Sequence, residues 1–403
     1  MARILVIAYT TYIHDGRVKR HAEALARRGD HVDVICLDSA HGANLHGVNL
    51  LGIRMPRYRG ASRTRYLRSY ARFLTVAAWT AFRSGLRRRY DLAIVCTMPD
   101  AAVLSALPLR FLGTKVLLDI HDTMPELYRD KFGGRRGAVG ARLLMGLERA
   151  SAACANRVLA VHDLHRARLV TAGIPARKIA VVMNAPDPEV FRPPRGVRQS
   201  TQEFTVACHG TLTHRLGLDV ALEAVELARR RLPGLRFLVI GTGDYLEEAR
   251  RLAARLCLDQ CVTFLSPVPV ERLPAALAGV DVGLVPNRAT SATHLMLPVK
   301  LLDYAAMGIP TIAARLRTIE HYFNGNAVRF FEPGNSADLA AAIEELHRDP
   351  ERRLRLAMHA RRIIQSIGWQ AQSTEYCRIV DSLLGNHENN QSPDALTQGK
   401  GAT

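Results

Sequence analysis

The sequence predicts an α/β protein of two domains, each built on a parallel β-sheet covered by helices. Short apolar runs rich in β-branched residues alternate with amphipathic segments of helical length along most of the chain, which is typical of βαβ units. These runs are hydrophobic at nearly every position, so we expect both faces of each sheet to be buried. A chain of 403 residues also exceeds the roughly 250–300 residues at which single cores stop growing.

The predicted strands fall into two sets, one in each half of the chain. The first set is 2–9, 31–37, 91–96, 115–120, 157–162 and 179–184, and the second is 204–210, 236–241, 262–266, 281–286, 310–314 and 327–331. Predicted helices between them include Val18–Arg28, Leu216–Arg231 and Asp244–Leu256. Open parallel sheets bind ligands at the carboxyl ends of their strands, so the residues that follow each strand are the first candidates for function.

The alternation is interrupted near the middle of the chain. Residues 186–202 are rich in proline, arginine and polar side chains, which is the composition of a linker. We therefore predict an N-terminal domain over 1–187, a linker over 188–203 and a C-terminal domain over 204–367. A last helix is predicted over Trp369–Leu384, within a segment bounded at 368–385, and the polar tail 386–403 is predicted to be disordered.

The bulk composition limits the class of protein. The formal net charge of +18 suits anionic partners such as phosphates, a membrane surface or nucleic acid. No apolar run reaches the roughly 18 residues of a membrane-spanning helix, and no signal-peptide pattern is present, so we expect a cytoplasmic protein. Cys257 and Cys261 lack a second Cys or His pair with zinc-ligand spacing, so no metal site is predicted.

Two glycine-containing segments follow predicted strands of the C-terminal half. In His209-Gly210-Thr211 the glycine would let a ligand approach the backbone, and the helix start that follows would present N–H groups to an anion beside Arg215. An ordinary strand–loop–helix turn explains this segment equally well. Gly241-x-Gly243 is a weaker signal, because a tight turn with Asp244 as the helix cap is at least as good an explanation as a ligand contact.

The segment Pro298–Pro310 predicts a helix with polar groups on one face. Pro298 suits an early helix position, and Gly308 with Pro310 would end the helix. Lys300 and Asp303 are three residues apart and therefore share a face. The pair fits either a surface ion pair or a site in which the lysine binds phosphate and the carboxylate binds ribose hydroxyls.

Polar side chains also gather after one predicted strand of the N-terminal half. The strand ends at Asp119-Ile120-His121-Asp122, and burying such a cluster without a use is costly. Reactive groups concentrate at strand ends, so His121 is a functional candidate, with a structural histidine as the alternative. After the first strand, Asp15 is predicted to cap a helix, and Arg17 either reaches an anion in the cleft or is solvated.

The stretch Arg54–Arg89 holds eleven arginines and no acidic residue. Tyr66, Tyr70, Phe73, Ala77 and Ala81 keep a helical period, while several of the arginines fall on another face. A basic amphipathic helix is typical of docking on an anionic membrane surface, but the apolar face could equally pack on the core. Both interpretations stay open at this point.

Taken in order, these segments resemble glycosyltransferase family four, the retaining group 1 glycosyltransferases. The resemblance spans about Ile4–Leu384 and implies the GT-B fold, in which the parallel sheets of two Rossmann-like domains face a central cleft and the last helix crosses back to the first domain. It depends on the number, order and spacing of several motifs. These are Asp15–Val18, Asp119–Asp122 with Pro125-Glu126, Met183–Asp187 at a hinge, His209–Leu212, Gly241-x-Gly243, Phe264-Leu265 and Pro298–Pro310.

The resemblance implies a role for each matching position. Arg215 and Lys300 would contact the donor diphosphate, and His121 would hydrogen-bond the transferred sugar, which makes these three the catalytic candidates. The implied donor-binding residues are Gly210, Thr211, Gly241, Gly243, Pro267, Val268, Leu297 and Asp303, the last at the ribose, and the implied acceptor-binding residues are Arg17, Asp122 and Glu126.

Three positions depart from the family pattern. The first Glu of the family's Glu-x7-Glu motif falls at Leu295, whose side chain cannot hydrogen-bond a sugar hydroxyl, and Asp303 replaces the second. The usual lysine before the helix glycine is Leu216, so Arg215 would substitute for it. We therefore expect the sugar contacts, and the donor affinity or donor type, to differ from the family pattern.

The expected function is transfer of a sugar from a nucleotide-diphosphate sugar to a hydroxyl acceptor, lipid-linked or small, in cell-envelope polysaccharide, glycolipid or natural-product biosynthesis. No cofactor or metal is expected, since an Asp-x-Asp pair is missing. A sugar-nucleotide epimerase and a non-catalytic nucleotide-binding relative are the alternatives, and peripheral contact with an anionic membrane is a further prediction. A nucleic-acid partner is not expected, because aromatic residues are only 6% of the chain and no nucleic-acid motif is present.

Overall fold

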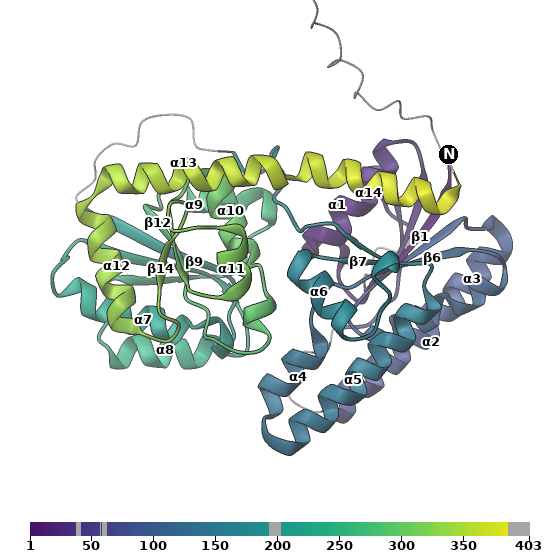
Figure 1. Ribbon diagram of the computed structural model, residues 1–403, viewed down its shortest axis with the longest axis horizontal. Coiled ribbons are helices and arrows are strands. Elements are labelled where there is room, and N and C mark those ends of the chain that lie inside the picture. The colour runs from purple at the N-terminus through teal and green to yellow at the C-terminus, as the bar shows by residue number, and fades with distance from the viewer. Residues whose placement is uncertain (38–41, 57, 59–62, 193–202, 386–403) are drawn as a thin grey trace, which may run out of the picture.

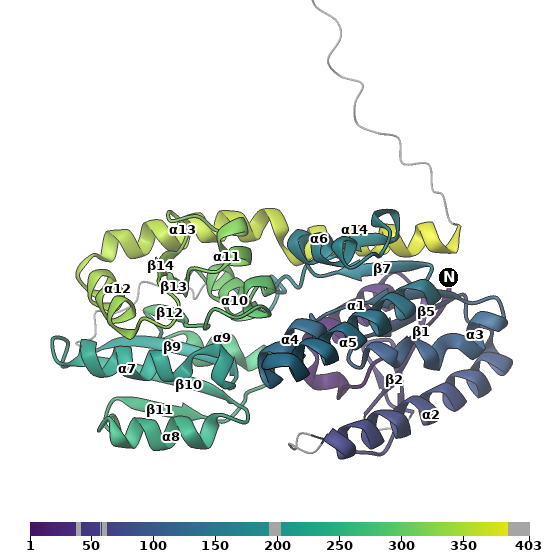
Figure 2. The same cartoon turned by 60° about the horizontal axis from the view of Figure 1, so that its bottom comes forward.

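The computed structural model confirms the two-domain α/β architecture (Figure 1). The structure describes residues 1–37, 42–56, 58, 63–192 and 203–385. Most of the predicted linker and the tail predicted to be disordered lie outside these described residues. The described strands form one eight-stranded and one six-stranded sheet, with helices on both faces of each (Figures 1 and 2). The domain boundaries proposed from the sequence stay a prediction.

The N-terminal sheet has the strand order β3-β4-β2-β1-β5-β6-β7-β8 and is parallel except for the antiparallel β3–β4 pair. All six strands predicted in this half are present, each a little shorter than its apolar run. The sequence did not predict β3, which has two residues, or β4, which carries Asn49 and ends in Gly52. The strands are β1 (Arg3–Ile7), β2 (His31–Cys36), β3 (Asn44–Leu45), β4 (Val48–Gly52), β5 (Leu92–Cys96), β6 (Lys115–Asp119), β7 (Arg157–Ala160) and β8 (Ile179–Val181).

The C-terminal sheet has the order β11-β10-β9-β12-β13-β14 and is parallel throughout. In each domain the strand order reverses beside the first strand, at β1 and at β9, and such switch points are where parallel sheets bind ligands. All six predicted strands of this half are present. They are β9 (Phe204–Thr211), β10 (Leu235–Thr242), β11 (Val262–Leu265), β12 (Val282–Val285), β13 (Thr311–Ala314) and β14 (Arg329–Phe331).

The helices pack on these sheets through three hydrophobic clusters, one on each face of the first sheet and one throughout the second domain. The α-helices of the first domain are α1 (Gly16–Arg27), α2 (Arg63–Arg88), α3 (Leu107–Phe111), α4 (Met124–Phe132), α5 (Gly134–Cys154) and α6 (Asp163–Thr171). Those that follow are α7 (Leu218–Arg229), α8 (Leu246–Arg255), α9 (Leu273–Leu277), α10 (Val299–Met307), α11 (Arg317–Tyr322), α12 (Ser336–Arg348), α13 (Pro350–Ile367) and α14 (Trp369–Leu384). The 3-10 turns are η1 (Tyr12–His14), η2 (Asp100–Ala106), η3 (Ala176–Lys178), η4 (His214–Leu216), η5 (Val270–Arg272) and η6 (Thr293–Leu295).

The last helix crosses back to the first domain, as predicted. Figure 1 shows α13 along the second domain and α14 continuing over the first. Tyr376 and Val380 of α14 are buried in the core that α1 shares, and Arg28 Nη1 lies 2.8 Å from Asp381 Oδ1. The chain therefore passes from the first domain to the second at the hinge near Asn184 and returns to the first through this helix.

Three helix starts differ from the prediction, and the first is α1, which begins at Gly16 rather than Val18. α7 begins at Leu218 because Gly217 adopts a left-handed conformation after the 3-10 turn η4. Only glycine fits there, since a Cβ atom would lie 1.8 Å from the Pro286 carbonyl oxygen. Asp244 does not cap α8, because the helix begins at Leu246 with Tyr245 at the cap position. The predicted cap at Asp15 is confirmed, since its side chain accepts a hydrogen bond from the Val18 amide.

Candidate active site between the two domains

A cavity of about 590 Å³ lies between the carboxyl ends of the two sheets. One wall comes from the segments after β1 and β6, and the other from the segment after β9 and the start of α10. It therefore joins the two switch points into one site. Of the predicted site residues, the cavity is lined by Arg17, His121, Asp122, Gly210, Thr211, Arg215, Val268, Leu297, Lys300 and Asp303, but not by Glu126, Gly241, Gly243 or Pro267.

Two cations of the C-terminal domain face this cavity and form no ion pair among the described residues. Arg215 Nη1 is buried and has no hydrogen-bond partner, and burial lowers the pKa of this guanidinium. Lys300 is 7% exposed, and the contact recorded for its Nζ atom is Cys208 Sγ at 3.5 Å. Desolvated cations without a counter-charge are costly, and a bound anion removes that cost. The interpretation of Lys300 and Asp303 as a surface ion pair is wrong, because both side chains are buried.

Asp303 presents a carboxyl group to the same cavity. Burial raises its pKa to about 7, against the opposing effect of the positively charged Arg20. Its Oδ2 atom lies 3.8 Å from His209 Nε2, but burial, and then Lys300, lower the pKa of His209 to about 3, so this imidazole is neutral. Asp303 is therefore available to accept hydrogen bonds from ligand hydroxyl groups.

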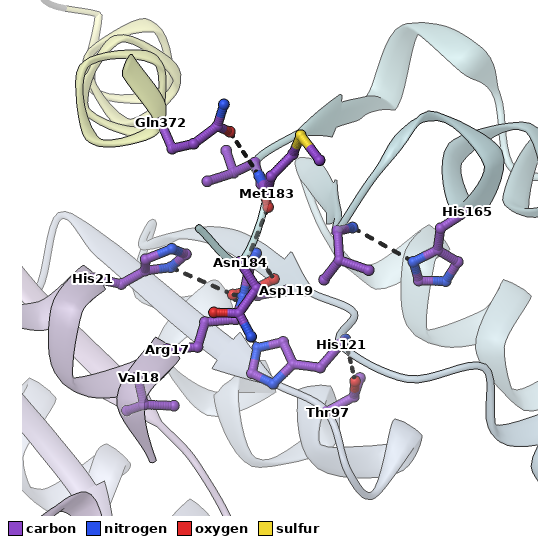
Figure 3. A network of polar contacts seen from close by, with 12 residues as sticks. Arg17, Val18, His21, Thr97, Asp119, His121, His165, Met183, Asn184 and Gln372 are labelled. Carbon is purple, nitrogen blue, oxygen red and sulfur yellow. Dashed lines mark hydrogen bonds and ion pairs between the residues drawn. The ribbon is translucent and has the colours of Figure 1, made fainter. Parts of the chain in front are cut away.

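His121 lies at the edge of a buried polar network (Figure 3). Its Nε2 atom is 3.0 Å from Asp119 Oδ2 at the end of β6. Burial alone would lower the pKa of His121, but the Asp119 carboxylate outweighs it and raises the pKa. Asp119 itself is fully buried, yet Arg17 and His121 hold its pKa well below the usual range. The carboxylate therefore lies beside the ring of His121 and favours its protonated form.

Arg17 belongs to this network rather than to solvent or to a free anion site. Its Nε and Nη2 atoms donate to the two oxygens of Asp119 at 3.0 and 2.8 Å, and Nη1 donates to the Val182 carbonyl at 3.0 Å. Cys96, Asp119 and His121 bring possible metal ligands within 4.8 Å of one another. These residues do not fit a metal ion, because Arg17 already engages both carboxylate oxygens.

Glu126 lies away from the cavity. Its two oxygens accept hydrogen bonds from Arg168 Nε and Nη2 at 2.9 and 3.0 Å, and Arg168 also pairs with the buried Glu148. This geometry ties α4 to α5 and α6, which is a structural role. Asp122, by contrast, lines the cavity from the N-terminal side, where its charge acts on Arg215 across the cleft.

Gly241 and Gly243 serve close packing between strands rather than ligand approach. A Cβ atom at Gly241 would lie 1.9 Å from the Gly210 carbonyl oxygen, and one at Gly243 would lie 1.9 Å from that of Leu212. The two glycines let β10 run beside β9 as far as the edge of the cavity. Gly210, which lines the cavity there, has a φ of 105°, a backbone conformation that favours glycine. The exposed Pro267 is also outside the cavity, while its neighbour Val268 lines it.

Sequence reasoning missed Arg20 and His162, which both line the cavity. Arg20 is one helical turn from Arg17, so the spacing within α1 could have indicated it. Its Nη2 atom lies 2.5 Å from Asn184 Oδ1 at the hinge, and its guanidinium packs over the Trp369 ring at 5.7 Å. His162 follows β7, but its partner is in the other domain, which no local sequence signal reveals.

Two family models match the chain on either side of the linker. Residues 16–185 match a glycosyl transferase 4-like domain, and residues 203–349 match the glycosyl transferases group 1. The chain belongs to the group 1 glycosyltransferases. Both halves of this glycosyltransferase therefore carry the family signal, with the cavity between them, which confirms the resemblance drawn from the motifs.

Curated relatives match this glycosyltransferase over about half of its length. It is 29% identical over 240 residues to a GDP-mannose-dependent alpha-(1-6)-phosphatidylinositol monomannoside mannosyltransferase of Mycobacterium tuberculosis, a match that covers 56% of this chain and 61% of the relative. It is also 29% identical over 182 residues to the putative colanic acid biosynthesis glycosyltransferase WcaL of Escherichia coli, covering 45% of this chain and 44% of the relative. The chain thus spans less than two thirds of these relatives.

Solved structures match the fold of the glycosyltransferase over nearly its whole length. A sucrose-phosphate synthase from Thermosynechococcus elongatus aligns with a TM-score of 0.76 at 17% identity, covering 96% of this chain and 100% of that one. Anabaena Alr3699/HepE, in complex with UDP and glucose, aligns with a TM-score of 0.72 at 17% identity, covering 95% and 100%. At such identities the likeness shows the GT-B fold alone.

Proposed function

We propose that this chain is a retaining glycosyltransferase that moves a sugar from a nucleotide-diphosphate sugar to a hydroxyl group. The observation that carries the proposal is the pair Arg215 and Lys300, two desolvated cations that face the cleft and form no ion pair in the described part of the chain. A diphosphate supplies the missing negative charge. The names of a GDP-mannose-dependent relative and of a UDP-bound structural neighbour support this choice of donor class.

The proposed reaction breaks the bond between the sugar C1 and the diphosphate oxygen and forms a bond from C1 to the acceptor oxygen. Negative charge grows on the leaving phosphate, where Arg215, Lys300 and the backbone near Gly210 stabilise it. The acceptor proton passes to the departing phosphate, which is the retaining route that the family resemblance implies. Two opposed carboxylates of the glycosidase kind are not needed for this route.

The remaining cavity residues orient the donor in this proposal. Asp303 accepts hydrogen bonds from the ribose hydroxyls, because its carboxyl group is buried in the cavity and its neighbour His209 is neutral. Asp119 engages Nε2 of His121, which leaves Nδ1 for a hydroxyl of the transferred sugar. The acceptor enters from the N-terminal side, beside Asp122.

The test is a product assay with UDP-, GDP- and dTDP-sugars, with and without hydroxyl acceptors. A glycosyltransferase releases nucleoside diphosphate faster when an acceptor is added, and the anomeric configuration of the product reports retention. An epimer formed from the donor alone would favour the epimerase. Nucleotide binding without any product from any donor would favour the non-catalytic relative.

We further propose that α2, α3 and α5 rest on an anionic lipid bilayer, where a lipid-linked acceptor would be found. Phe73, Ala77 and Ala81 of α2 are buried, so one face of the helix packs on the core, as the second interpretation expected. The outer face of α2 nevertheless exposes Trp79 by 62%, and α3 exposes Phe111 by 88%. None of the described helices is both long and apolar enough to cross a membrane.

The charge of this surface supports the choice of partner. Figure 2 shows α2, α3 and α5 along the N-terminal domain, and η2 packs between α2 and α5. The two acidic residues of these elements, Asp100 and Glu148, are buried. Exposed arginines therefore face outward without acidic neighbours in these elements, which suits anionic headgroups. The exposed arginines include Arg65, Arg68, Arg72, Arg83, Arg87 and Arg88 on α2, Arg110 on α3, and Arg135, Arg136, Arg142 and Arg149 on α5. Of these, Arg88 pairs with Asp33 of β2.

Vesicle sedimentation tests this surface. Wild-type protein is expected to bind vesicles that contain phosphatidylglycerol and not pure phosphatidylcholine vesicles. The double variant Arg68→Glu/Arg72→Glu should weaken binding at least about 10-fold, since each charge near a membrane contributes about 1 kcal/mol. The control Arg361→Glu/Arg362→Glu changes two exposed arginines of α13 and should bind as wild type. Equal losses in both variants would contradict a docking role for α2.

A further inference from the structure

The short turn η6 of the C-terminal domain is held at one end by the N-terminal domain. It lies in the loop between β12 and α10, and Ala292 directly precedes it. Asp130 near the end of α4 accepts hydrogen bonds from Ser291 Oγ at 2.6 Å, from the Ser291 amide at 3.3 Å and from the Ala292 amide at 2.8 Å. These bonds outweigh partial burial and lower the pKa of Asp130. A charged acceptor thus caps the free amides at the start of η6.

The other end of η6 is held by His162, which follows β7. Its Nδ1 atom accepts a hydrogen bond from the His165 amide at 3.0 Å, so the ring hydrogen must be on Nε2. Nε2 then donates to the Leu295 carbonyl at 3.0 Å. Burial lowers the pKa of His162 to about 4, so this neutral tautomer persists through the physiological pH range.

The clamped loop forms a wall of the candidate active site. Leu295, Met296 and Leu297 line the cavity, and α10 with Lys300 begins directly after them. The Leu295 side chain is apolar, so it cannot hold the loop in place by a hydrogen bond to a ligand. The backbone of this segment is held from its own domain, where the Thr318 hydroxyl donates to the His294 carbonyl at 2.8 Å. Side chains from the opposite domain hold both ends of it.

We propose that Asp130 and His162 are positioning residues that clamp η6 across the domain interface and thereby complete the donor-sugar wall of the site. The wall is complete when the two domains are apposed, so donor-sugar placement is coupled to domain closure. The role toward the sugar depends on the proposed function, but the clamp itself does not. Asp130 accepts three hydrogen bonds at one end of the loop and His162 donates one at the other end, so loss of either residue loosens the same loop.

A second contact between the domains supplies a matched control. Tyr322 Oη accepts from the Asp163 amide at 3.0 Å and donates to Asp163 Oδ2 at 2.9 Å, and neither residue belongs to η6. Tyr322→Phe removes this contact with little change of shape. It therefore loosens the domain interface without removing a bond to η6.

Hydrogen exchange measured by mass spectrometry tests the clamp without requiring activity. In Asp130→Ala and in His162→Leu, amides of residues 288–297 should exchange about 5-fold faster or more, while Tyr322→Phe leaves them unchanged. His162→Gln should restore slow exchange, because its side-chain amide can donate to the Leu295 carbonyl. Asp130 is partly exposed, so Asp130→Ala tests the clamp even if His162→Leu fails to fold.

The same variants separate the clamp from the catalytic proposal. With a working donor, we expect kcat to fall about 10-fold in Asp130→Ala and His162→Leu, with binding of the free nucleoside diphosphate within about 2-fold of wild type. Unchanged exchange in both clamp variants, or an equal change in Tyr322→Phe, would overturn the clamp. If the clamp variants exchange faster but the wild-type protein neither binds nor turns over any nucleotide sugar, the clamp is supported and the proposed function is contradicted.

Discussion

Arg17 of α1 donates two hydrogen bonds to Asp119 at the end of β6 and a third to the carbonyl of Val182 at the hinge. Nε2 of His121 contacts the same carboxylate, as Figure 3 shows. One buried guanidinium thus connects the first helix, the sheet edge, the candidate catalytic histidine and the segment that leads to the second domain. Its hydrogen bonds hold these segments together beside the cavity.

Arg17→Ala should lower the free energy of unfolding by about 3–5 kcal/mol, because it leaves the buried Asp119 carboxylate without its main partner. Chemical denaturation measures this change. Arg230→Ala is the control, since Arg230 is 67% exposed in its pair with Glu226 and its loss should cost less than about 1 kcal/mol. Similar small losses in both variants would show that the Arg17 network does not support the fold.

Lys300→Ala and Arg215→Ala should each lower turnover of the nucleotide sugar by about 10²–10³, since each removes a fixed cation from the leaving phosphate. Steady-state kinetics on folded, monodisperse protein measures the effect. Lys115→Ala is the matched control, because Lys115 is exposed at the start of β6, far along the strand from the cavity edge. Wild-type turnover in Lys300→Ala and Arg215→Ala would remove the phosphate assignment.

Asp303→Asn should make the ligand-free protein more stable than wild type at alkaline pH. The pKa of Asp303 is raised to about 7, so the folded state holds a proton that the unfolded chain releases near pH 4. Wild-type stability therefore falls as pH rises from about 4 to 7, by up to about 4 kcal/mol from this group, and the variant lacks that contribution. Thermal unfolding of both proteins from pH 4 to 8 measures it, and parallel curves would contradict the assignment.

Donor affinity should show the opposite trend with pH. Ionised Asp303 accepts two hydroxyl hydrogen bonds, so the dissociation constant of the nucleotide sugar should fall as pH rises through about 7. The dependence should be absent in Asp303→Asn. Calorimetric titrations at pH 6 and pH 8 measure it, and a wild-type affinity that is the same at both values would count against a ribose contact.

Gly217→Ala should destabilise the protein far more than Gly308→Ala, although both glycines have a φ of 71°. A Cβ atom at Gly308 meets nothing within 4 Å, so only the backbone strain of about 1 kcal/mol is expected there. At Gly217 the added atom would lie 1.8 Å from the Pro286 carbonyl oxygen and force η4 and Arg215 to move. Equal unfolding free energies for the two variants would contradict this packing.

The fold was predictable from the sequence because its signals are local. Every predicted strand is present, and α14 covers Trp369–Leu384 as expected, since buried strands and amphipathic helices show their period within a few residues. The two-residue β3 and the strand β4 show no such hydrophobic period, so they were not predicted. The residues around Lys300 were recognisable because the helix and its Gly308 cap form a contiguous motif.

The interior of the site was less predictable because its partners are distant in the chain. Arg17 and Asp119 are 102 residues apart, and His162 and Leu295 are 133 apart in different domains. No local pattern shows that Arg17 is neutralised, that Glu126 turns toward Arg168, or that Arg20 reaches the hinge. These pairings follow from the packing of the two domains, which only the structure shows.

Isothermal titration calorimetry with UDP-, GDP- and dTDP-sugars tests the central claim most directly, because it asks whether Arg215 and Lys300 hold a diphosphate. We expect at least one of these donors to bind the wild-type protein, and the double variant Arg215→Ala/Lys300→Ala to lose that binding while keeping its fold. A folded wild-type protein that binds none of the donors, or a double variant that binds as well as wild type, would contradict the account.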